Sequence, residues 1–287
     1  MNSVLVCPVK INITLRILGK RDDGYHELVS AFWRKNGAER LTIHPINGEN
    51  INDELEIRGA ELQGENLLTK TLRMARVTNP DIPPLRMELD KAYPAGSGIG
   101  AGSGDAAALI RFLQEKYGVL REPDAVARLG ADVAFLADGS EAALAAGIGD
   151  QLTPMEHMGG LTWVLAFPEW PSGTASAYAA LDELRARCPS VGFSASGCIE
   201  EAREITARLR AKERVGLLPN DFIEVAAIEH GDEYRAAFDA AAESSLAWGL
   251  CGSGSAFFAV CADLESAKRT ERKFTEYNWV IKTAIME

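Results

Sequence analysis

Residues 94–108 carry glycine at every second position from Gly96 to Gly104 and then become alanine-rich. A helical pattern follows and reaches Tyr117, where Gly118 is placed to end it. Because glycine has no Cβ, such a run can adopt positive φ and bring its N–H groups close to a ligand. The helix N-terminus adds unpaired donors and the positive end of the helix dipole. The pattern therefore predicts a phosphate site where a loop enters a helix.

The class of phosphate loop is a separate question. No Gly-x-x-x-x-Gly-Lys-Ser/Thr occurs, which excludes a Walker A loop. A dinucleotide fingerprint can be read at Gly96, Gly98 and Ala101, with Asp124 as the ribose contact. That fingerprint normally closes the first strand of a βαβ unit, whereas this run follows a predicted strand at 85–89, far into the chain. A flexible turn without a ligand is the remaining alternative.

Composition limits the function further. The chain has 287 residues, 47% of them hydrophobic, which is enough for about two domains with real cores. Its net charge of −11 argues against nucleic acid as the main partner, because phosphate backbones require clustered Lys and Arg. No long apolar span or signal peptide is recognisable, so we expect no membrane association.

The cysteines indicate the compartment. The chain has 5 of them, widely spaced and without a Cys-x-x-Cys pair: Cys7, Cys188, Cys198, Cys251 and Cys261. An odd number without such spacing favours reduced thiols in a cytoplasmic protein. The histidines His44, His157 and His230 have no partners at metal-ligand spacing, so no zinc site is predicted.

The hydrophobic periodicity predicts mixed strands and helices. Strands are expected at 4–6, 11–17, 41–44, 51–57, 85–89, 161–167, 256–260 and 279–283. Helices are expected at 67–76, from the glycine run to 117, and at 122–129, 175–188, 199–212, 234–246 and 264–274. Because strands and helices do not alternate strictly, the fold class is α+β rather than a doubly wound sheet. A turn signal at Gly149 predicts domains 1–149 and 150–287.

Five segments, taken in order, carry a resemblance. They are Pro8-Val-Lys-Ile-Asn12, Gly24-Tyr-His-Glu27, the loop 94–108, Leu129-Gly-Ala-Asp-Val133 and Gly252-Ser-Gly-Ser255. This order resembles the GHMP kinase superfamily from residue 8 to about residue 283. Gly-Tyr-His-Glu, preceded by Gly-Lys-Arg-Asp-Asp, is similar to the branch formed by the 4-diphosphocytidyl-2-C-methyl-D-erythritol kinases.

The resemblance implies a fold and a reaction. The fold would be the two-domain α+β GHMP kinase fold, with an N-terminal domain like domain 2 of ribosomal protein S5 and a ferredoxin-like C-terminal domain. In that fold the last strand belongs either to the C-terminal domain or, if the chain returns, to the N-terminal domain. The reaction would be ATP-dependent, Mg²⁺-assisted phosphorylation of the substrate's 2-hydroxyl in non-mevalonate isoprenoid biosynthesis. The protein would be a monomer or weak homodimer.

The resemblance also implies site residues. The family's catalytic lysine and aspartate match Lys10 and Asp132, which would offset phosphoryl charge and accept or orient the hydroxyl proton. From the residues alone, Asp138 and Asp150 are equal candidates. The substrate-binding positions of the family match Asn12, Tyr25, His26, Phe32 and Tyr178, with a histidine that hydrogen-bonds cytosine and aromatic rings that stack on it.

For ATP, the family match implies the first glycine loop and two residues near the adenine, Asn66 and Lys91. A second glycine loop would lie beside the active site and contact phosphate or substrate. These residues are Asn66, Lys91, Pro94, Ala95, Gly96, Ser97, Gly98, Ile99, Gly100, Ala101, Gly102, Ser103, Gly104 and Asp105, and then Gly252, Ser253 and Gly254. A plain tight turn is the alternative for the second loop.

One departure stands out. The family loop usually reads Gly-Ser-Ser-Asn-Ala-Ala, whereas this chain has Gly104 and Asp105 at the third and fourth of these positions. A carboxylate near a polyphosphate is repulsive unless a cation lies between them, so Asp105 is hypothesised to be a direct or water-mediated Mg²⁺ ligand. Two alternative functions stay open: a GHMP kinase for another alcohol, of the sugar or homoserine type, and a non-catalytic binding protein that has kept the fold.

Overall fold

The computed structural model describes residues 2–45, 52–60, 66–120, 122–187 and 192–286. The chain divides into two compact units. Unit 1 comprises residues 1–10, 36–95 and 100–140, and unit 2 comprises residues 11–35, 96–99 and 141–287. The predicted single boundary at 149 is therefore too simple, because strands β1 (Ser3–Lys20) and β2 (His26–Pro45) each contribute to both units.

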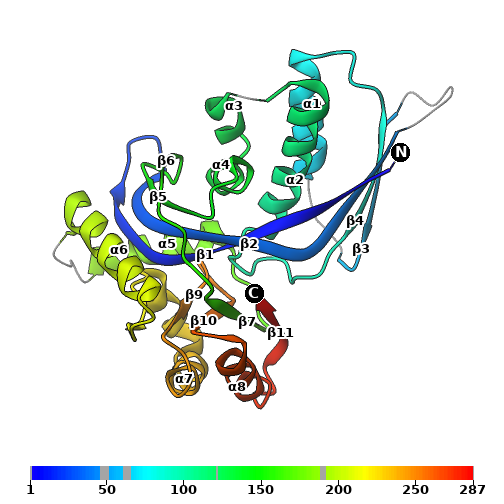
Figure 1. The fold of residues 1–287 in the computed structure, drawn as a ribbon. Coiled ribbons are helices and arrows are strands. Elements are labelled where there is room, and N and C mark those ends of the chain that lie inside the picture. The colour runs from blue at the N-terminus through cyan, green and yellow to red at the C-terminus, as the bar shows by residue number, and fades with distance from the viewer. Residues whose placement is uncertain (1, 46–51, 61–65, 121, 188–191, 287) are drawn as a thin grey trace. The chain divides into compact units, whose positions relative to one another are not determined.

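In its described residues, unit 1 combines a small sheet with helices. The end of β2 pairs antiparallel with β4 (Leu85–Asp90), and β4 pairs parallel with β3 (Glu54–Arg58). Buried and more exposed side chains alternate along β4, as the two-residue period of a strand requires. The helices are α1 (Leu67–Thr78), α2 (Ala101–Tyr117), α3 (Pro123–Ala127) and α4 (Ala131–Asp138). Figure 1 shows α1 and α2 lying over this sheet.

Helix α2 begins earlier than its alanine-rich stretch. Gly100, in the left-handed region at φ 68°, is its N-cap, and Gly118, at φ 70°, closes its C-terminus as the sequence predicted. Residues 101–105 of the predicted loop are therefore the first turn and a half of the helix. The remaining loop, 94–100, has positive φ at Gly96 and Gly98.

The departure at Gly104 has a structural reason. A Cβ atom there would lie 1.8 Å from the carbonyl oxygen of Pro8 on β1, so only glycine lets the helix pack this closely. Although serine forms helices better than glycine, Gly104→Ser is expected to lower the free energy of unfolding by about 1–3 kcal/mol. Urea unfolding measures this change. The matched control is Gly102→Ser, where no atom lies within 4 Å of the new Cβ; equal stability of the two variants would contradict the prediction.

Unit 2 is built on a sheet in the order β11-β7-β10-β9-β8. The pairs are antiparallel except for β8–β9. The strands are β7 (Thr162–Pro168), β8 (Gly216–Leu217), β9 (Ala247–Leu250), β10 (Phe257–Cys261) and β11 (Val280–Met286). Because β11 pairs with β7, the last strand stays with the C-terminal sheet and does not return to the first domain. A hairpin of β5 (Ala142–Ala146) and β6 (Gln151–Pro154) pairs with the first half of β2.

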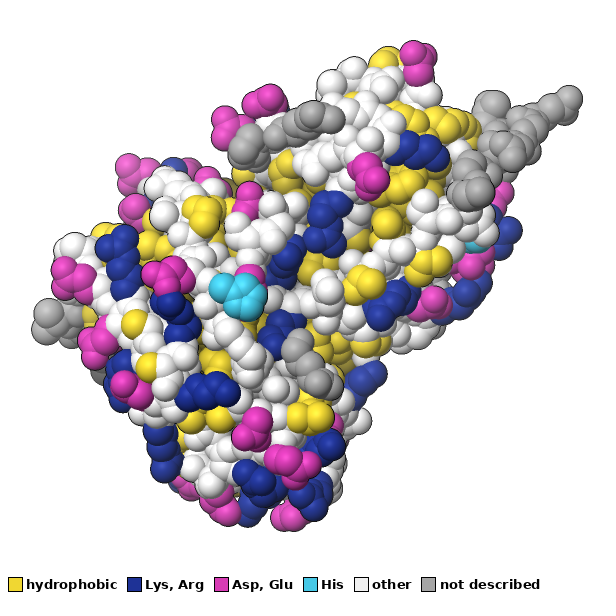
Figure 2. All heavy atoms as spheres, viewed as in Figure 1, with side chains coloured by type: hydrophobic (Ala, Val, Ile, Leu, Met, Phe, Trp, Pro, Cys, Tyr) yellow, Lys and Arg dark blue, Asp and Glu magenta, His cyan; other side chains and the backbone are white. Residues whose placement is uncertain are grey.

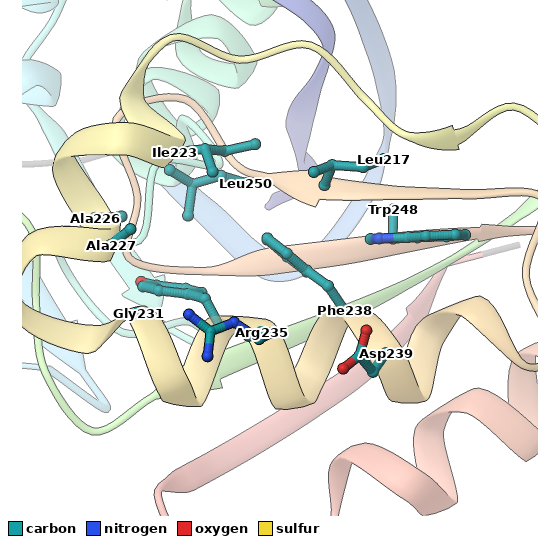
Figure 3. Close-up of a pocket in the computed structure, with 11 residues that line it drawn as sticks. Leu217, Ile223, Ala226, Ala227, Gly231, Arg235, Phe238, Asp239, Trp248 and Leu250 are labelled. Atoms are coloured by element: carbon teal, nitrogen blue, oxygen red, sulfur yellow. The ribbon is translucent and has the colours of Figure 1, made fainter.

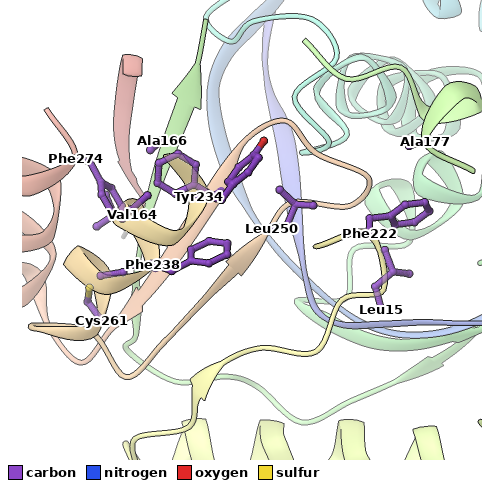
Figure 4. Packing of buried hydrophobic residues seen from close by; sticks show 14 of the residues in the cluster. Leu15, Val164, Ala166, Ala177, Phe222, Tyr234, Phe238, Leu250, Cys261 and Phe274 are labelled. Carbon is purple, nitrogen blue, oxygen red and sulfur yellow. The ribbon is translucent and has the colours of Figure 1, made fainter. Parts of the chain in front are cut away.

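The described part of unit 2 also contains the helices α5 (Thr174–Arg187), α6 (Ala195–Arg210), α7 (Phe222–Ala242) and α8 (Leu264–Phe274). Figure 4 shows part of the core that α5, α7 and α8 share with the sheet. In it the ring of Phe257 on β10 packs edge to face against Tyr234 and Phe238 of α7 and Phe274 of α8. Such burial of apolar side chains is the main stabilising term of the unit.

Several predicted elements are longer than their patterns indicated. The two strands expected at 4–6 and 11–17 are one strand, β1, in which every residue from Cys7 to Leu15 is buried. Helix α7 starts at Phe222 rather than Tyr234, and the predictions missed α4 and β5. Residue 51 of the strand predicted at 51–57 and Cys188 at the end of the helix predicted at 175–188 lie outside the described residues.

Two further observations concern the surface and the thiols. None of the helices in the described ranges is long and apolar enough to cross a membrane. On the face shown in Figure 2, Lys and Arg side chains are interspersed with Asp and Glu. Cys7, Cys198, Cys251 and Cys261, the described cysteines, are buried and form no disulfide with one another.

Candidate active site

Lys10 and Asp132 form an ion pair in unit 1. The Lys10 Nζ lies 3.3 Å from Asp132 Oδ2. Lys10 comes from β1, and Asp132 stands in the first turn of α4, which follows Gly130. The lysine side chain is 5% exposed and the aspartate side chain 33%. The ammonium is therefore buried behind a carboxylate that a ligand can reach.

The pair lies against the N-terminus of α2. A Cβ atom on Gly100, the N-cap, would lie 3.4 Å from both Asp132 Oδ2 and Lys10 Cε. The first N–H groups of a helix have no acceptor within the helix and attract anions. Unit 1 thus brings together an anion-binding helix end, a buried cation and an accessible carboxylate, each from a different segment.

The second glycine loop packs on residues 96–99 within unit 2. The N–H groups of Ser255 and Ala256 donate to the carbonyl oxygens of Gly96 and Ser97, each at 3.2 Å. A Cβ atom on Gly98 would lie 1.9 Å from the Cys251 carbonyl oxygen. The loops therefore support each other through their backbones, which requires glycine at the contact.

Lys91 lies between two buried carboxylates in unit 1. Its Nζ is 2.5 Å from Glu39 Oε2 and 2.8 Å from Asp105 Oδ2, and the three side chains are at most 5% exposed. Glu39 Oε1 also accepts from the N–H groups of Ala92 and Tyr93 at 3.1 Å. This Glu39–Lys91–Asp105 cluster ties the chain entering the glycine loop to helix α2.

The cluster corrects the hypothesis for Asp105. Its carboxylate is engaged by Lys91 and buried, so it does not offer the exposed oxygen that a Mg²⁺ ligand needs. Among the residues that the structure describes, no group of three or more His, Cys, Asp and Glu side chains gathers as a metal site.

Asp105 makes stability depend on pH. Burial, opposed by Lys91 and reinforced by Glu39, raises the pKa of its carboxyl from 3.8 to about 7. The folded protein thus holds a proton that the unfolded chain releases between these pH values, and Asp105 makes the free energy of unfolding fall as pH rises through that window. Asp105→Asn removes this contribution, so its stability relative to the parent is expected to rise from pH 4 to pH 8.

Urea unfolding across that range checks this prediction. The control is Asp124→Asn, which alters an exposed carboxylate on α3. Parallel stability curves for Asp105→Asn and the parent would refute it.

Unit 2 brings together two of the predicted substrate-binding residues. The ring of His26, at the start of β2, stacks on that of Tyr178 of α5, with centroids 4.6 Å apart and planes 30° apart. Tyr178 also meets Phe222 edge to face at 4.8 Å. The neighbouring Tyr25 is 61% exposed, as a ring available for stacking on a ligand would be.

The other predicted binding residues are less open. Asn12 and Phe32 are each 3% exposed, and Asn12 Nδ2 donates to Ser30 Oγ at 2.9 Å. Asn66 caps α1, where its Oδ1 accepts from the N–H of Leu68 at 2.7 Å. The ligand contacts of these three residues stay predictions.

A cavity of about 340 Å³ lies in unit 2 between α7 and strands β8 and β9. Figure 3 shows Leu217, Leu250, Phe238 and Trp248 around it. Its lining is mostly apolar, and it contains none of the residues predicted from the sequence. Phosphoryl transfer requires positioned charges, so this cavity is not assigned to the reaction.

Sequence reasoning missed Glu39 of the buried cluster. It also missed Asp182, whose Oδ1 lies 2.6 Å from His26 Nε2, and Lys20, whose Nζ lies 2.7 Å from Asp182 Oδ2. Glu39 is an isolated charge within a strand, and no local pattern marks it. Asp182 lies one helical turn after Tyr178, and this spacing could have indicated that both side chains share a face of α5. Lys20 lies inside the Gly-Lys-Arg-Asp-Asp segment, where only the structure shows its partner.

Comparisons with known proteins identify the family of the chain. Residues 66–153 match the GHMP kinases N terminal domain, and residues 196–278 match the GHMP kinases C terminal domain. The chain is 32% identical over 283 residues to a 4-diphosphocytidyl-2-C-methyl-D-erythritol kinase of Moorella thermoacetica, covering 95% of each protein. The enzyme of the same name from Thermotoga petrophila is 31% identical, with 89% of this chain and 91% of that protein covered.

Solved structures show the same fold. A crystal structure of 4-(cytidine 5'-diphospho)-2C-methyl-D-erythritol kinase superposes with a TM-score of 0.78 and 26% identity, covering 100% of this chain and 98% of that one. Homoserine kinase from Cytophaga hutchinsonii has a TM-score of 0.67 at 14% identity, with 100% and 94% covered, which is a likeness of fold alone.

Proposed function

The chain belongs to the GHMP kinases, and on that premise we propose that it transfers the γ-phosphoryl group of ATP to the 2-hydroxyl of 4-diphosphocytidyl-2-C-methyl-D-erythritol. The observation that carries the proposal is the Lys10–Asp132 pair at the N-terminus of α2. The relatives that share nearly the whole length bear the name of this activity.

The geometry of the pair suits phosphoryl transfer. The partly exposed Asp132 carboxylate accepts the proton of the attacking hydroxyl as the new O–P bond forms and the bond to the ADP oxygen breaks. Lys10 holds the carboxylate in place from its buried side and offsets negative charge on the group in transfer. The N–H groups at the start of α2 also stabilise the negative charge on the group in transfer. Most of the rate enhancement in such reactions comes from positioning and charge stabilisation.

Substrate recognition rests on unit 2. His26 offers a ring nitrogen and its backbone groups to a cytosine edge, and Tyr25 and Tyr178 offer aromatic faces. Asn12 and Phe32 are proposed to support the substrate from β1 and β2. Residues 94–105, with Asn66 and the stem of Lys91, are proposed to bind ATP. The second glycine loop, 252–254, is proposed to contact phosphate or substrate.

ATP is the phosphoryl donor. Mg²⁺ is expected to arrive with the nucleotide, whose phosphate oxygens suit this ion, and no side chain of this protein is assigned to it. The buried cysteines, which form no disulfide with one another, accord with the predicted cytoplasmic location.

An ATP-coupled assay with the purified chain tests the proposal. Phosphorylation of 4-diphosphocytidyl-2-C-methyl-D-erythritol is expected, at a kcat/KM far above that for homoserine or a free sugar. Transfer to one of those alcohols instead would show that the protein is a kinase whose substrate differs from the one proposed. Nucleotide binding without transfer to any alcohol would favour a non-catalytic binding protein.

A further inference from the structure

His26 has a second partner besides Tyr178. Its Nε2 lies 2.6 Å from Asp182 Oδ1. Because Asp182 follows Tyr178 by one turn of α5, the same helix stacks on the imidazole and contacts its edge. The His26 side chain is 8% exposed. The orientation of the ring is therefore fixed on both its face and its edge.

Lys20 engages the other oxygen of Asp182. Its Nζ lies 2.7 Å from Oδ2. Partial burial disfavours the charged form of Asp182, but hydrogen bonds from Lys20 and His26 outweigh burial and lower the pKa of this carboxyl. Near neutral pH, Asp182 is an ionised carboxylate, which accepts hydrogen bonds and donates none.

An acceptor at 2.6 Å requires a hydrogen on His26 Nε2. In a neutral imidazole, a hydrogen on one nitrogen leaves the other as an acceptor, and the partner of the first nitrogen sets this choice. Within the described part of the chain, no hydrogen-bond partner of His26 Nδ1 is found. That nitrogen is thus left to present its lone pair to a ligand.

We propose that Asp182, held by Lys20, is a positioning residue that keeps His26 in its Nε2–H tautomer, so that Nδ1 selects cytosine over uracil. This inference rests on the proposed function, because it concerns the base of that substrate. Cytosine presents an exocyclic amine that donates to Nδ1, whereas uracil presents a carbonyl oxygen at the same position. Two acceptors facing each other in a half-buried site leave both unsatisfied.

The tautomer is testable without any substrate. ¹⁵N NMR of the full-length protein at pH 8 resolves the imidazole nitrogens, since the chain has only 4 histidines, and His26→Gln assigns the signal. We expect a protonated Nε2 and an unprotonated Nδ1. In Asp182→Asn, whose amide both donates and accepts, we expect a mixture of tautomers. A protonated Nδ1 in the parent would overturn the proposal.

The selectivity is tested by calorimetry with CDP and UDP. The parent is expected to bind CDP about ten- to a hundredfold more tightly than UDP. Asp182→Asn is expected to lose most of this preference and to raise KM for the full substrate with little change in kcat. The matched control is Glu183→Gln, the next residue on α5, whose side chain is 72% exposed. Lys20→Met provides a second, milder variant with the same direction of effect.

The outcomes separate the two proposals. An unchanged CDP-to-UDP ratio in both Asp182→Asn and Lys20→Met would overturn the role of Asp182 while leaving the kinase activity intact. Binding of neither nucleotide, with no transfer to the cytidine substrate, would overturn the selection of cytosine together with the proposed function. The NMR result would still decide whether Asp182 sets the tautomer.

Discussion

Asp132→Asn is expected to lower kcat for phosphoryl transfer by about 10²- to 10⁴-fold, the range for loss of a positioned general base. The amide keeps the size of the side chain but cannot take the proton of the attacking hydroxyl. Because the Asp132 side chain is partly exposed and is not part of the core, the substitution should leave the fold unaffected. Steady-state kinetics with ATP and the cytidine substrate, together with urea unfolding, measure both effects.

Asp138→Asn is the matched control for this prediction. It lies on the same helix, α4, is exposed, and is an equal candidate for the catalytic aspartate by sequence alone. Its kcat should equal that of the parent. Lys10→Met should resemble Asp132→Asn, and the double variant should be little worse than either, because the two side chains act as a unit. Full activity of Asp132→Asn would remove the basis of the proposed mechanism.

Lys91→Met is expected to lower the free energy of unfolding by about 3–5 kcal/mol, the usual loss when one partner of a buried ion pair is removed. The substitution leaves Glu39 and Asp105 facing each other without a cation, in a site where neither carboxylate meets water. Urea unfolding at pH 8, above the pKa of about 7 that Asp105 has in the parent, is the appropriate measurement.

Lys70→Met is the control, because Lys70 is an exposed lysine on α1 of the same unit. Its substitution should change stability by less than about 0.5 kcal/mol. A loss for Lys91→Met as small as that of the control would show that Glu39 and Asp105 do not depend on their cation. The second reporter is ATP affinity, which should fall, since Glu39 and Asp105 no longer fix the chain on either side of the glycine loop.

Local patterns predicted the elements that depend on local interactions. Helix α8 has the bounds that its periodicity indicated, and its start at Asp263 is a capping box. Gly118 ends α2 as expected, because a left-handed C-cap needs only the conformational freedom of glycine. The start of α2 was misplaced, since two of its first five residues are glycines, which oppose a helix by propensity, and the close packing of Gly104 on β1 is not a local signal.

In the candidate site, too, some features could be predicted from the sequence and others depend on contacts between distant residues. The family resemblance picked Lys10 and Asp132 from many lysines and aspartates, and the structure places them 3.3 Å apart. The same reasoning assigned Asp105 to a metal, because its neighbours in sequence pointed to phosphate. Its neighbours in space are Lys91 and Glu39, which no spacing rule connects to it.

The sequence by itself determined a glycine loop that enters a helix, an α+β chain, and the family to which these segments correspond. These features follow from backbone freedom, hydrophobic period and residue order, all of which are local. Only the tertiary structure decided that Lys91 pairs with Glu39 and Asp105, and that His26 pairs with Asp182. Such pairs join side chains far apart in the chain, and the energy of a charge depends on the burial and partners that the packed elements supply.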